Sequence, residues 1–320
     1  MSQVAFVIPE RGAQPKITTV SVPEIKAGEV LVKILAAGVN PHENLTINTG
    51  LFAESFPYIL GSDGAGIVEQ IGPSVTNVKK GDLVVMHGDI FDASAATFQQ
   101  YAKTDAHLIA KIPPNITVEQ AATVPVAVAA VFVGLYHSTG LHLTPPWINE
   151  GIGKYKGQGI FIVGGASSVG QFAIQLAKLS GFSTIATTAS ESNHKLVTSL
   201  GATHVFSRSS SAADIKSAIG PIKLGFDAIA TPETQETKND AAPIKARWTL
   251  GSSVRTKEIS VPFWAAVEGW LKDGTLKPNR VEVLPGGLGA VSEALDRLKR
   301  GAVSGKKLVI KPQETDSSSL

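Results

Sequence analysis

The chain has 320 residues, of which 43% are hydrophobic and 18% are charged, a composition typical of a globular protein and not of a disordered one. Its 29 Lys and Arg residues and 27 Asp and Glu residues give a formal net charge of +2, which argues against a nucleic-acid binder with a basic face. The chain contains no cysteine, which excludes disulfides, cysteine-ligated zinc, iron–sulfur clusters and thiol nucleophiles. The length suits two domains or one large α/β unit.

The N-terminal residues lack the charged region and the long apolar stretch of a secretory signal, and they predict a strand instead. The most apolar segment, residues 121–136, is shorter than a membrane span requires and contains Pro125. It predicts a buried core helix. We therefore expect a cytoplasmic protein that neither enters a membrane nor binds nucleic acid.

The first third of the chain has the pattern of an irregular β-rich module. Short β-prone runs, broken by Gly, Pro and Asn, occur at residues 28–34, 66–72 and 80–86. Helix signals begin near Thr117, a residue type that favours helix N-caps.

From residue 159 the pattern changes to alternating strands and helices, which predicts a doubly wound parallel sheet. The first strand, 159–163, is continuously apolar, as expected of a strand covered on both faces. We predict an α/β fold with a β-rich domain at 1–125, a doubly wound domain at 126–270 and a segment at 271–320 that returns to the β-rich domain. Further strands are expected at 184–188, 204–206, 226–230, 281–284 and 307–310, with helices at 169–177, 194–200, 212–218, 263–272 and 290–300.

The turn after the strand at 159–163 reads GGASSVG at residues 164–170, a G-x-G-x-x-G pattern with Ser167 in place of the middle glycine. Gly165 suits a tight turn, and Gly170 lets the following helix pack on its strand. A turn of this composition can be purely structural, but its place between a buried strand and an amphipathic helix predicts dinucleotide binding. The residues expected to hold the diphosphate are Gly165, Ala166, Ser167, Ser168 and Val169.

The end of the second strand favours NADPH over NADH. An NAD site places Asp or Glu there to bond the ribose 2′-hydroxyl. In this chain the strand at 184–188 contains no acid, and the first acid after its end is Glu191. Ser190, Asn193 and Lys195 are suited to a 2′-phosphate, and Arg208 follows the third strand at a place where it can join them. The alternative is a capping serine beside solvated surface cations.

Five segments of the chain form a recognisable set. They are AAGVNP at 36–41, LGSDGAG at 60–66, KGDLV at 80–84, the turn at Gly165 and SGKKLV at 304–309. Together they resemble the medium-chain dehydrogenase/reductase superfamily, over nearly the whole chain. The resemblance implies a GroES-like β-rich catalytic domain interrupted by a Rossmann nucleotide-binding domain.

The residues that bind zinc in the zinc-dependent members of that superfamily are replaced here. Those members carry Cys at the position of Asn40 and Gly-His-Glu at the position of residues 61–63, which read Gly-Ser-Asp in this chain. Among the histidines, His137 and His142 come nearest to a ligand-like spacing, and they fit better as residues flanking a turn. We therefore expect no metal site and no Lewis-acid alcohol oxidation.

Four further segments, at 123–125, 134–136, 231–235 and 284–288, narrow the resemblance. They resemble the zinc-independent branch, which includes quinone reductases and fungal enoyl reductases, some of them trans-acting partners of polyketide synthases. This resemblance implies an NADPH-dependent reductase that transfers hydride to the β-carbon of an activated alkene. The expected partners are a small-molecule or acyl-thioester substrate and a polyketide synthase, and the expected state is a monomer or homodimer. An NADPH quinone reductase and a nucleotide-binding protein without turnover are the alternatives.

Further site residues are implied by the same resemblance. Asn40 is expected to face the nicotinamide ribose and to take part in catalysis, and Thr231 and Lys306 are expected to contact the cofactor. Members of the branch often read NPVDWK where this chain reads NPHENL from Asn40, so Leu45 replaces their lysine.

A general acid that protonates the α-carbon would assist such a reaction, although water can serve. Tyr58, Tyr136 and His42 are the candidates, and each has a structural alternative. Tyr136 falls in the apolar helix, Tyr58 lies beside Pro57, and His42 lies in a surface loop. Asp63, in a glycine-rich strand entry, is better explained as a structural acid.

The nucleotide domain looks short by about one helix–strand unit. A doubly wound domain of this kind has six strands, but residues 236–245 after the fourth strand are polar and interrupted by Pro243. Residues 247–254 resemble the sixth strand of the family. We therefore expect a Rossmann sheet that lacks a unit, which would impair cofactor binding or expose sheet edges.

Overall fold

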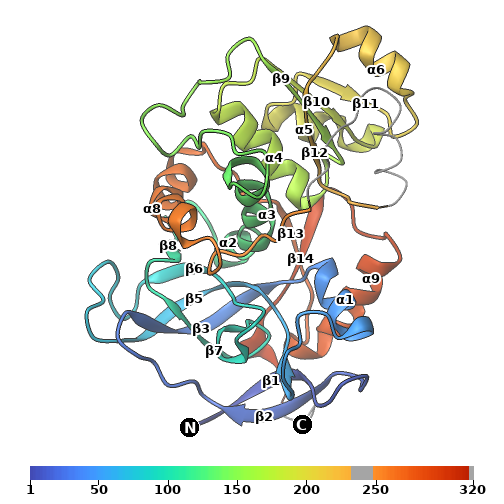
Figure 1. The fold of residues 1–320 in the computed structure, drawn as a ribbon. Coiled ribbons are helices and arrows are strands. Elements are labelled where there is room, and N and C mark those ends of the chain that lie inside the picture. The colour runs from blue at the N-terminus through green and yellow to red at the C-terminus, as the bar shows by residue number, and fades with distance from the viewer. Residues whose placement is uncertain (232–247, 317–320) are drawn as a thin grey trace. The chain divides into compact units, whose positions relative to one another are not determined.

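A computed structural model describes residues 1–231 and 248–316 of the chain (Figure 1). The chain divides into two units: unit 1 comprises residues 1–126, 253–274 and 278–320, and unit 2 comprises residues 127–252 and 275–277. Unit 2 is thus inserted into the sequence of unit 1, which is the order that the sequence analysis expects of a β-rich domain interrupted by a nucleotide fold.

Unit 1 is built on two β-sheets, which confirms the predicted GroES-like module. The smaller sheet has the order β2 (Lys16–Ser21), β1 (Ser2–Ile8), β4 (Tyr58–Ile59). The main order of the larger sheet is β13 (Arg280–Val283), β14 (Lys306–Ile310), β3 (Glu29–Gly38), β5 (Asp63–Ile71), β6 (Leu83–His87), β8 (Ile109–Lys111). A further strand, β7 (Tyr101–Asp105), pairs with β3.

The pairing of β3 with β5 depends on a glycine. The antiparallel register of these strands shifts between Ile34 and Ala36, where Gly66 faces Ile34. A Cβ atom at Gly66 would lie 1.9 Å from the carbonyl oxygen of Lys33, so only glycine permits the approach of the two backbones at this irregularity.

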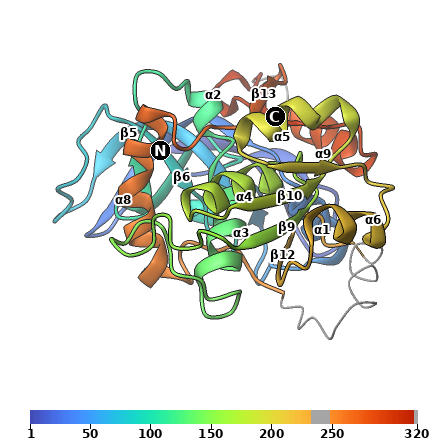
Figure 2. The same cartoon turned by 90° about the horizontal axis from the view of Figure 1, so that it is seen from above.

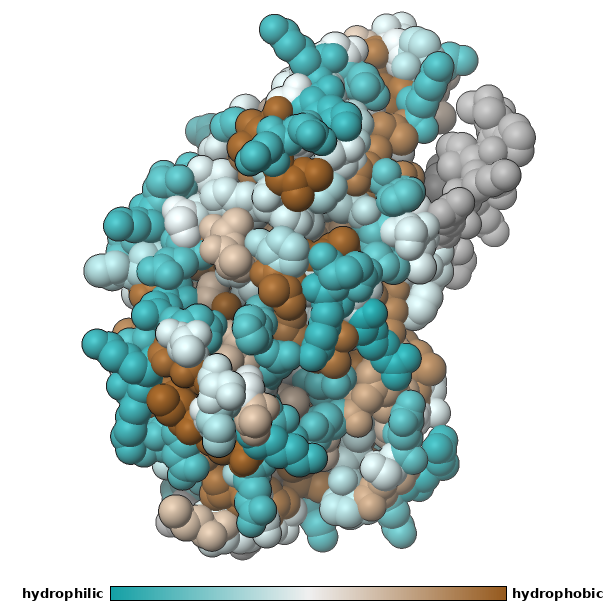
Figure 3. Space-filling view, turned by 60° about the vertical axis from the view of Figure 1, so that its left-hand side comes forward, coloured by the Kyte–Doolittle hydropathy of each residue, from teal (hydrophilic) through white to brown (hydrophobic). Residues whose placement is uncertain are grey.

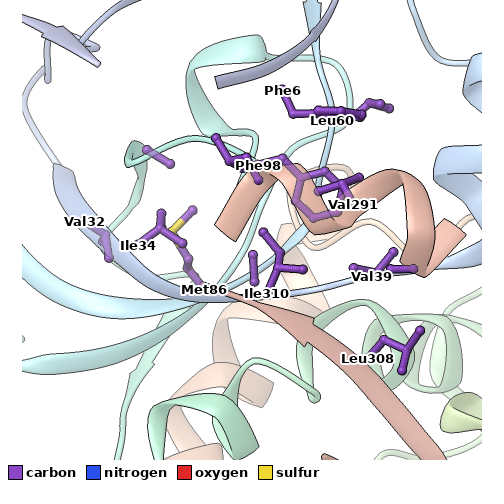
Figure 4. Packing of buried hydrophobic residues seen from close by; sticks show 14 of the residues in the cluster. Phe6, Val32, Ile34, Val39, Leu60, Met86, Phe98, Val291, Leu308 and Ile310 are labelled. Carbon is purple, nitrogen blue, oxygen red and sulfur yellow. The ribbon is translucent and has the colours of Figure 1, made fainter. Parts of the chain in front are cut away.

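The core of unit 1 forms where the larger sheet meets helix α9 (Val291–Lys299) (Figure 4). Met86 of β6, Ile310 of β14 and Val291 of α9 point into one apolar cluster together with Phe98, and all four side chains are buried. Burial of such side chains is the main favourable term in forming this unit.

The helices of unit 1 are short except for α8. The helix α8 (Lys257–Asp273) contains Pro262 and starts six residues before the predicted 263. It buries Phe263 and Trp264 and packs against β8, so it belongs to unit 1, whereas the predicted boundary at residue 270 assigned most of it to the nucleotide domain. The remaining helical segments are α1 (Pro41–Thr49), α2 (Val118–Ala121) and the 3₁₀ turns η1 (Ala93–Ala95), η3 (Gly287–Ala290) and η4 (Pro312–Glu314).

Unit 2 contains a parallel sheet with helices beside it (Figure 2). Along the sheet, the third, second, first and fourth strands of the unit are neighbours, which is the Rossmann order and confirms the predicted doubly wound fold. The strands run in the order β11 (His204–Phe206), β10 (Thr184–Thr188), β9 (Gly159–Val163), β12 (Leu224–Asp227). The helices are α3 (Pro125–Tyr136), α4 (Ser168–Leu179), the 3₁₀ turn η2 (Glu191–Asn193), α5 (His194–Leu200) and α6 (Ala212–Ile219).

In the part of unit 2 that the structure describes, the sheet ends at β12. Residues 236–245, where the sequence analysis places the missing helix–strand unit, lie outside the described residues. Residues 248–254, compared there with a sixth strand, form no strand. A strand needs a paired neighbour for its backbone groups, and the described residues supply no fifth strand next to β12.

The stretch Val118–Tyr136 is long and apolar enough, by composition, to cross a membrane. In the structure, however, 72% of its most apolar window is buried inside the fold. Figure 3 shows hydrophilic residues over most of the visible face and hydrophobic residues only in small groups. The stretch is therefore explained as the predicted core helix.

Candidate active site

The ends of three strands of unit 1 bring a buried polar cluster together. In the ladders, Gly38 of β3 faces Asp63 of β5 on one side and Val309 of β14 on the other. Asn40 follows β3 by two residues and Lys307 precedes Val309 by two, so the antiparallel register sets these two side chains opposite each other. We call Asn40, Asp63 and Lys307 the Lys307 cluster.

The Lys307 cluster is a closed set of charge-assisted bonds. The ammonium nitrogen of Lys307 lies 2.9 Å from Oδ2 of Asp63 and also donates to Oδ1 of Asn40. The amide nitrogen Nδ2 of Asn40 donates to the same Asp63 oxygen at 2.8 Å, and Oδ1 of Asp63 accepts the backbone N–H of Val126 at 2.6 Å. The side chains of Lys307 and Asp63 are 4% and 0% exposed. A buried ion pair of this kind persists only because each charge has several partners.

Two titratable residues at the start of α1 adjoin the Lys307 cluster. Asn40 is the N-cap of this helix, and Oε2 of Glu43 accepts the backbone N–H of Asn40 at 2.6 Å, as in a capping box. The ring nitrogen Nε2 of His42 lies 3.1 Å from Oγ of Ser62 and 3.4 Å from Oε1 of Glu43. Burial raises the pKa of Glu43 to about 8 and lowers the pKa of His42 to about 4. At neutral pH both groups are therefore uncharged.

A second histidine, His87, lies at the end of β6. Its Nδ1 atom is 2.8 Å from Oγ of Ser253, which also accepts the indole N–H of Trp264 at 3.0 Å. Burial lowers the pKa of His87 to about 4, against the opposing effect of Asp63. His87 is thus a neutral ring bonded within unit 1.

The two tyrosines considered as acids use their hydroxyls inside the fold. The hydroxyl of Tyr58 donates to the carbonyl oxygen of Ile90 at 2.7 Å, and burial raises its pKa above the usual range. The hydroxyl of Tyr136 lies 2.7 Å from Oγ of Ser180, and its pKa is raised by burial as well. These bonds favour the structural alternative for both residues.

The glycine-rich turn of unit 2 is held against the end of β10. The backbone N–H groups of Gly164 and Gly165 donate to Oγ1 and to the carbonyl oxygen of Thr188, each at 3.0 Å. A Cβ atom at Gly165 would lie 2.2 Å from Oγ1 of Thr187. The predicted need for glycine at position 165 thus has a steric cause in the neighbouring strand.

The first turn of α4 follows this glycine-rich turn. Ser167 is its N-cap, and its side chain accepts the N–H of Gly170 at 3.0 Å. The N–H groups of Ser168 and Val169 lie in the first turn of the helix, where no helical carbonyl oxygen is available to accept them. The helix dipole makes this end positive. Helix N-termini of this kind bind phosphate groups in other proteins, and the contact of this turn, Ala166 included, with a diphosphate stays a prediction.

The residues predicted to hold a 2′-phosphate follow the ends of two paired strands. Nδ2 of Asn193 donates to Oγ of Ser190 at 2.9 Å, directly after β10. Arg208 comes two residues after Phe206, whose carbonyl oxygen accepts the N–H of Ala189 at 3.0 Å. The parallel pairing of β10 and β11 places both segments at the same edge of the sheet. Arg208 is exposed, as is Lys195 in α5.

Comparison with known proteins shows to which family the chain belongs. Residues 26–114 match the model of the alcohol dehydrogenase GroES-like domain, and residues 168–261 match that of the zinc-binding dehydrogenases. A trans-enoyl reductase of Aspergillus japonicus is 32% identical to the chain, over 88% of this chain and 89% of that protein. The chain belongs to the medium-chain dehydrogenase/reductase superfamily.

Two further comparisons support membership of this superfamily. A trans-enoyl reductase of Gibberella fujikuroi is 28% identical over 95% of this chain and 98% of its own length. That alignment spans 351 positions, more than the 320 residues of this chain, so the relative has residues that this chain lacks. An alcohol dehydrogenase superfamily protein from Novosphingobium aromaticivorans has the same fold, with a TM-score of 0.78 at 24% identity over 97% of this chain and 99% of that one.

The superfamily pattern led the sequence analysis to Asn40, and the structure shows where its side chain lies. Both of its polar groups are bonded to Asp63 and Lys307, and the residue is 3% exposed. Its predicted contact with a nicotinamide ribose stays a prediction. Thr231 is half-buried beyond the end of β12, and its contact with the cofactor also stays a prediction.

Sequence reasoning selected Lys306 for a contact with the cofactor, which stays a prediction, and it did not select Lys307. The ammonium of Lys306 pairs with Glu282, which also binds Arg297 at 2.7 Å, and the Lys306 side chain is 39% exposed. Lys307 is the lysine that enters the polar cluster. Side chains alternate between the two faces of a strand, so its spacing of two residues from Val309 was the available signal.

Replacing Lys307 by Met should lower the free energy of unfolding by about 3–5 kcal/mol, because Asp63 would remain buried without its cation. The change Lys80→Met is the matched control, since Lys80 forms an exposed ion pair with Glu69 at 2.8 Å and such pairs contribute about 0–1 kcal/mol. Urea unfolding followed by tryptophan fluorescence measures both. The double change Asp63→Asn with Lys307→Met should recover part of the loss, and equal effects of the two single changes would contradict this account.

Proposed function

We propose that the protein is an NADPH-dependent reductase of activated C=C bonds that works without a metal ion. The observation that carries the proposal is the Lys307 cluster, which stands at the positions where zinc-dependent relatives are expected to hold their metal. The nucleotide turn of unit 2 and the names of two relatives, both trans-enoyl reductases, support the reaction class.

The donor set of unit 1 fits an internal cation better than zinc. Catalytic zinc uses three imidazole, thiolate or carboxylate ligands, whereas an amide and a hydroxyl stand at residues 40 and 62. The ammonium of Lys307 already neutralises Asp63, the carboxylate at this place. In residues 1–231 and 248–316, no group of three or more His, Cys, Asp or Glu side chains is arranged to hold a metal ion.

The residues of unit 2 fit the diphosphate of a nicotinamide dinucleotide. The N–H groups of Ser168 and Val169 would bind its oxygens, and Gly165 lets the turn lie against Thr187 of the neighbouring strand. When bound, the nicotinamide supplies a hydride for the β-carbon of the alkene. The protein itself binds the cofactor, orients the substrate and provides the proton for the α-carbon.

The edge of the sheet next to this turn favours NADPH. Ser190 and Asn193 offer a hydroxyl and an amide, and Lys195 and Arg208 offer two cations. Between the end of β10 and Glu191 there is no acid that would repel a phosphate. For the substrate we propose an enoyl thioester delivered by a polyketide synthase in the cytoplasm, because two relatives carry the name trans-enoyl reductase.

The purified protein should oxidise NADPH when it is mixed with an α,β-unsaturated thioester, as followed by the loss of NADPH absorbance. Enals and simple quinones are the comparison substrates. Faster oxidation with quinones than with every alkene would favour the quinone reductase. Binding of NADPH without oxidation by any of these substrates would favour a nucleotide-binding protein without turnover.

Replacing Arg208 by Ala should weaken NADPH binding about 10- to 100-fold and leave NADH binding unchanged, because a hydrogen bond to a charged group is worth about 1.5–3 kcal/mol. Ser190→Asp should weaken NADPH binding further through charge repulsion. Fluorescence titration measures both affinities. Lys216→Ala, which removes another exposed cation of unit 2, is the control. If NADPH affinity is the same in all of these variants, the 2′-phosphate is bound elsewhere.

A further inference from the structure

We propose that Glu43 and His42 form a proton relay that delivers the α-carbon proton of the reduction, with Glu43 as the source and His42 as the group that meets the substrate. This inference rests on the proposed reductase activity and assigns the proton donor that the reaction needs. Glu43 also caps α1 through its bond to the backbone of Asn40, so the relay gives this side chain a second role.

The geometry leaves one oxygen of Glu43 available for a proton. Oε2 accepts the backbone N–H of Asn40 at 2.6 Å. The other oxygen, Oε1, is buried and has no hydrogen-bond partner among the described residues. Nε2 of His42 lies 3.4 Å from this oxygen. A buried polar atom without a partner is unfavourable, and a proton on Oε1 removes the charge that would otherwise be buried there.

The surrounding charges keep this proton in place at neutral pH. Burial is the largest cause of the raised pKa of Glu43, about 8, and Asp63 raises it further, while Lys307 and the bond from Asn40 lower it. Glu43 in turn helps to raise the pKa of Tyr58. Glu43 is therefore a neutral acid at pH 7, and it loses its proton as the pH rises through about 8.

His42 is the group through which the proton leaves this site. Burial lowers its pKa to about 4; Lys307 and His87 lower it further, while Asp63 raises it, so the ring is neutral. Its side chain is 22% exposed, whereas that of Glu43 is 0% exposed. Ser62, 3.1 Å from Nε2, orients the ring. In the described residues Nδ1, at the other side of the ring, makes no hydrogen bond.

The relay moves one proton and changes no oxidation state. After hydride reaches the β-carbon, the N–H bond at Nδ1 breaks as a C–H bond forms at the α-carbon, and the enolate charge is neutralised. The O–H bond at Oε1 of Glu43 breaks as an N–H bond forms at Nε2 of His42. Glu43 is then a carboxylate, and water restores the starting state by protonating Nδ1 while Nε2 returns its proton to Oε1.

The change Glu43→Gln tests the relay with little disturbance of the fold, because Gln also serves at the N3 position of a capping box. The rate of alkene reduction in the wild type should fall as the pH rises through about 8. Glu43→Gln and His42→Gln should each reduce the rate about 100-fold or more, and Glu43→Gln should remove the alkaline fall. The controls are Glu54→Gln and His107→Gln, at exposed positions of unit 1, and they should leave rate and pH profile unchanged.

Infrared spectroscopy tests the same proton without turnover. The wild type should show a carboxylic-acid C=O band at pH 7 that disappears as the pH rises through about 8, and Glu43→Gln should lack that band while Glu54→Gln keeps it. Absence of the band in the wild type overturns the relay. A wild type that reduces alkenes while Glu43→Gln keeps its rate and pH profile overturns the relay alone. A wild type that oxidises no NADPH with any alkene overturns the reductase, and the catalytic relay with it.

Discussion

The buried ion pair between Lys307 and Asp63 is the interaction on which the site of unit 1 depends. It joins the ends of β14 and β5, and Asn40 at the end of β3 closes it. Its charges also act on the neighbouring acid and base, since Lys307 lowers and Asp63 raises the pKa of Glu43. The pair therefore joins three strand ends, and its two charges shift the pKa of Glu43 in opposite directions, while burial is the largest cause of the raised value.

Under the proposed function, this arrangement gives a physical reason for a change of chemistry within the superfamily. A zinc ion at this place would polarise an alcohol or carbonyl oxygen. A lysine ammonium that is already bonded to Asp63 and Asn40 has its charge satisfied inside the protein. Alkene reduction also needs a proton at the α-carbon. In the proposed relay, His42 and Glu43 at the start of α1 supply this proton.

The parts that the sequence predicted well are those in which neighbouring residues specify the structure. The strand, glycine turn and helix around Gly165 are set by local spacing, and the Rossmann order follows from alternating elements. The spacing from Val309 indicates the face of the strand on which Lys307 lies, but its contact with Asn40 and Asp63 depends on which strands are neighbours, and a single chain does not reveal that. The raised pKa of Glu43 arises from burial by segments distant in sequence, so no local pattern could indicate it. Pro262 suggested a helix start at 263, but tertiary packing extends α8 back to Lys257.

The central claim is that hydride passes from the cofactor to the β-carbon of an alkene in a protein without a metal ion. The most direct test is a single turnover of chelator-treated protein with NADPH deuterated at C4 and an enoyl thioester, with the product analysed by NMR. The account predicts that cofactor deuterium is found only at the β-carbon and that the new hydrogen at the α-carbon comes from the solvent. An unlabelled product, or activity that is lost with the chelator and restored by zinc, would contradict it.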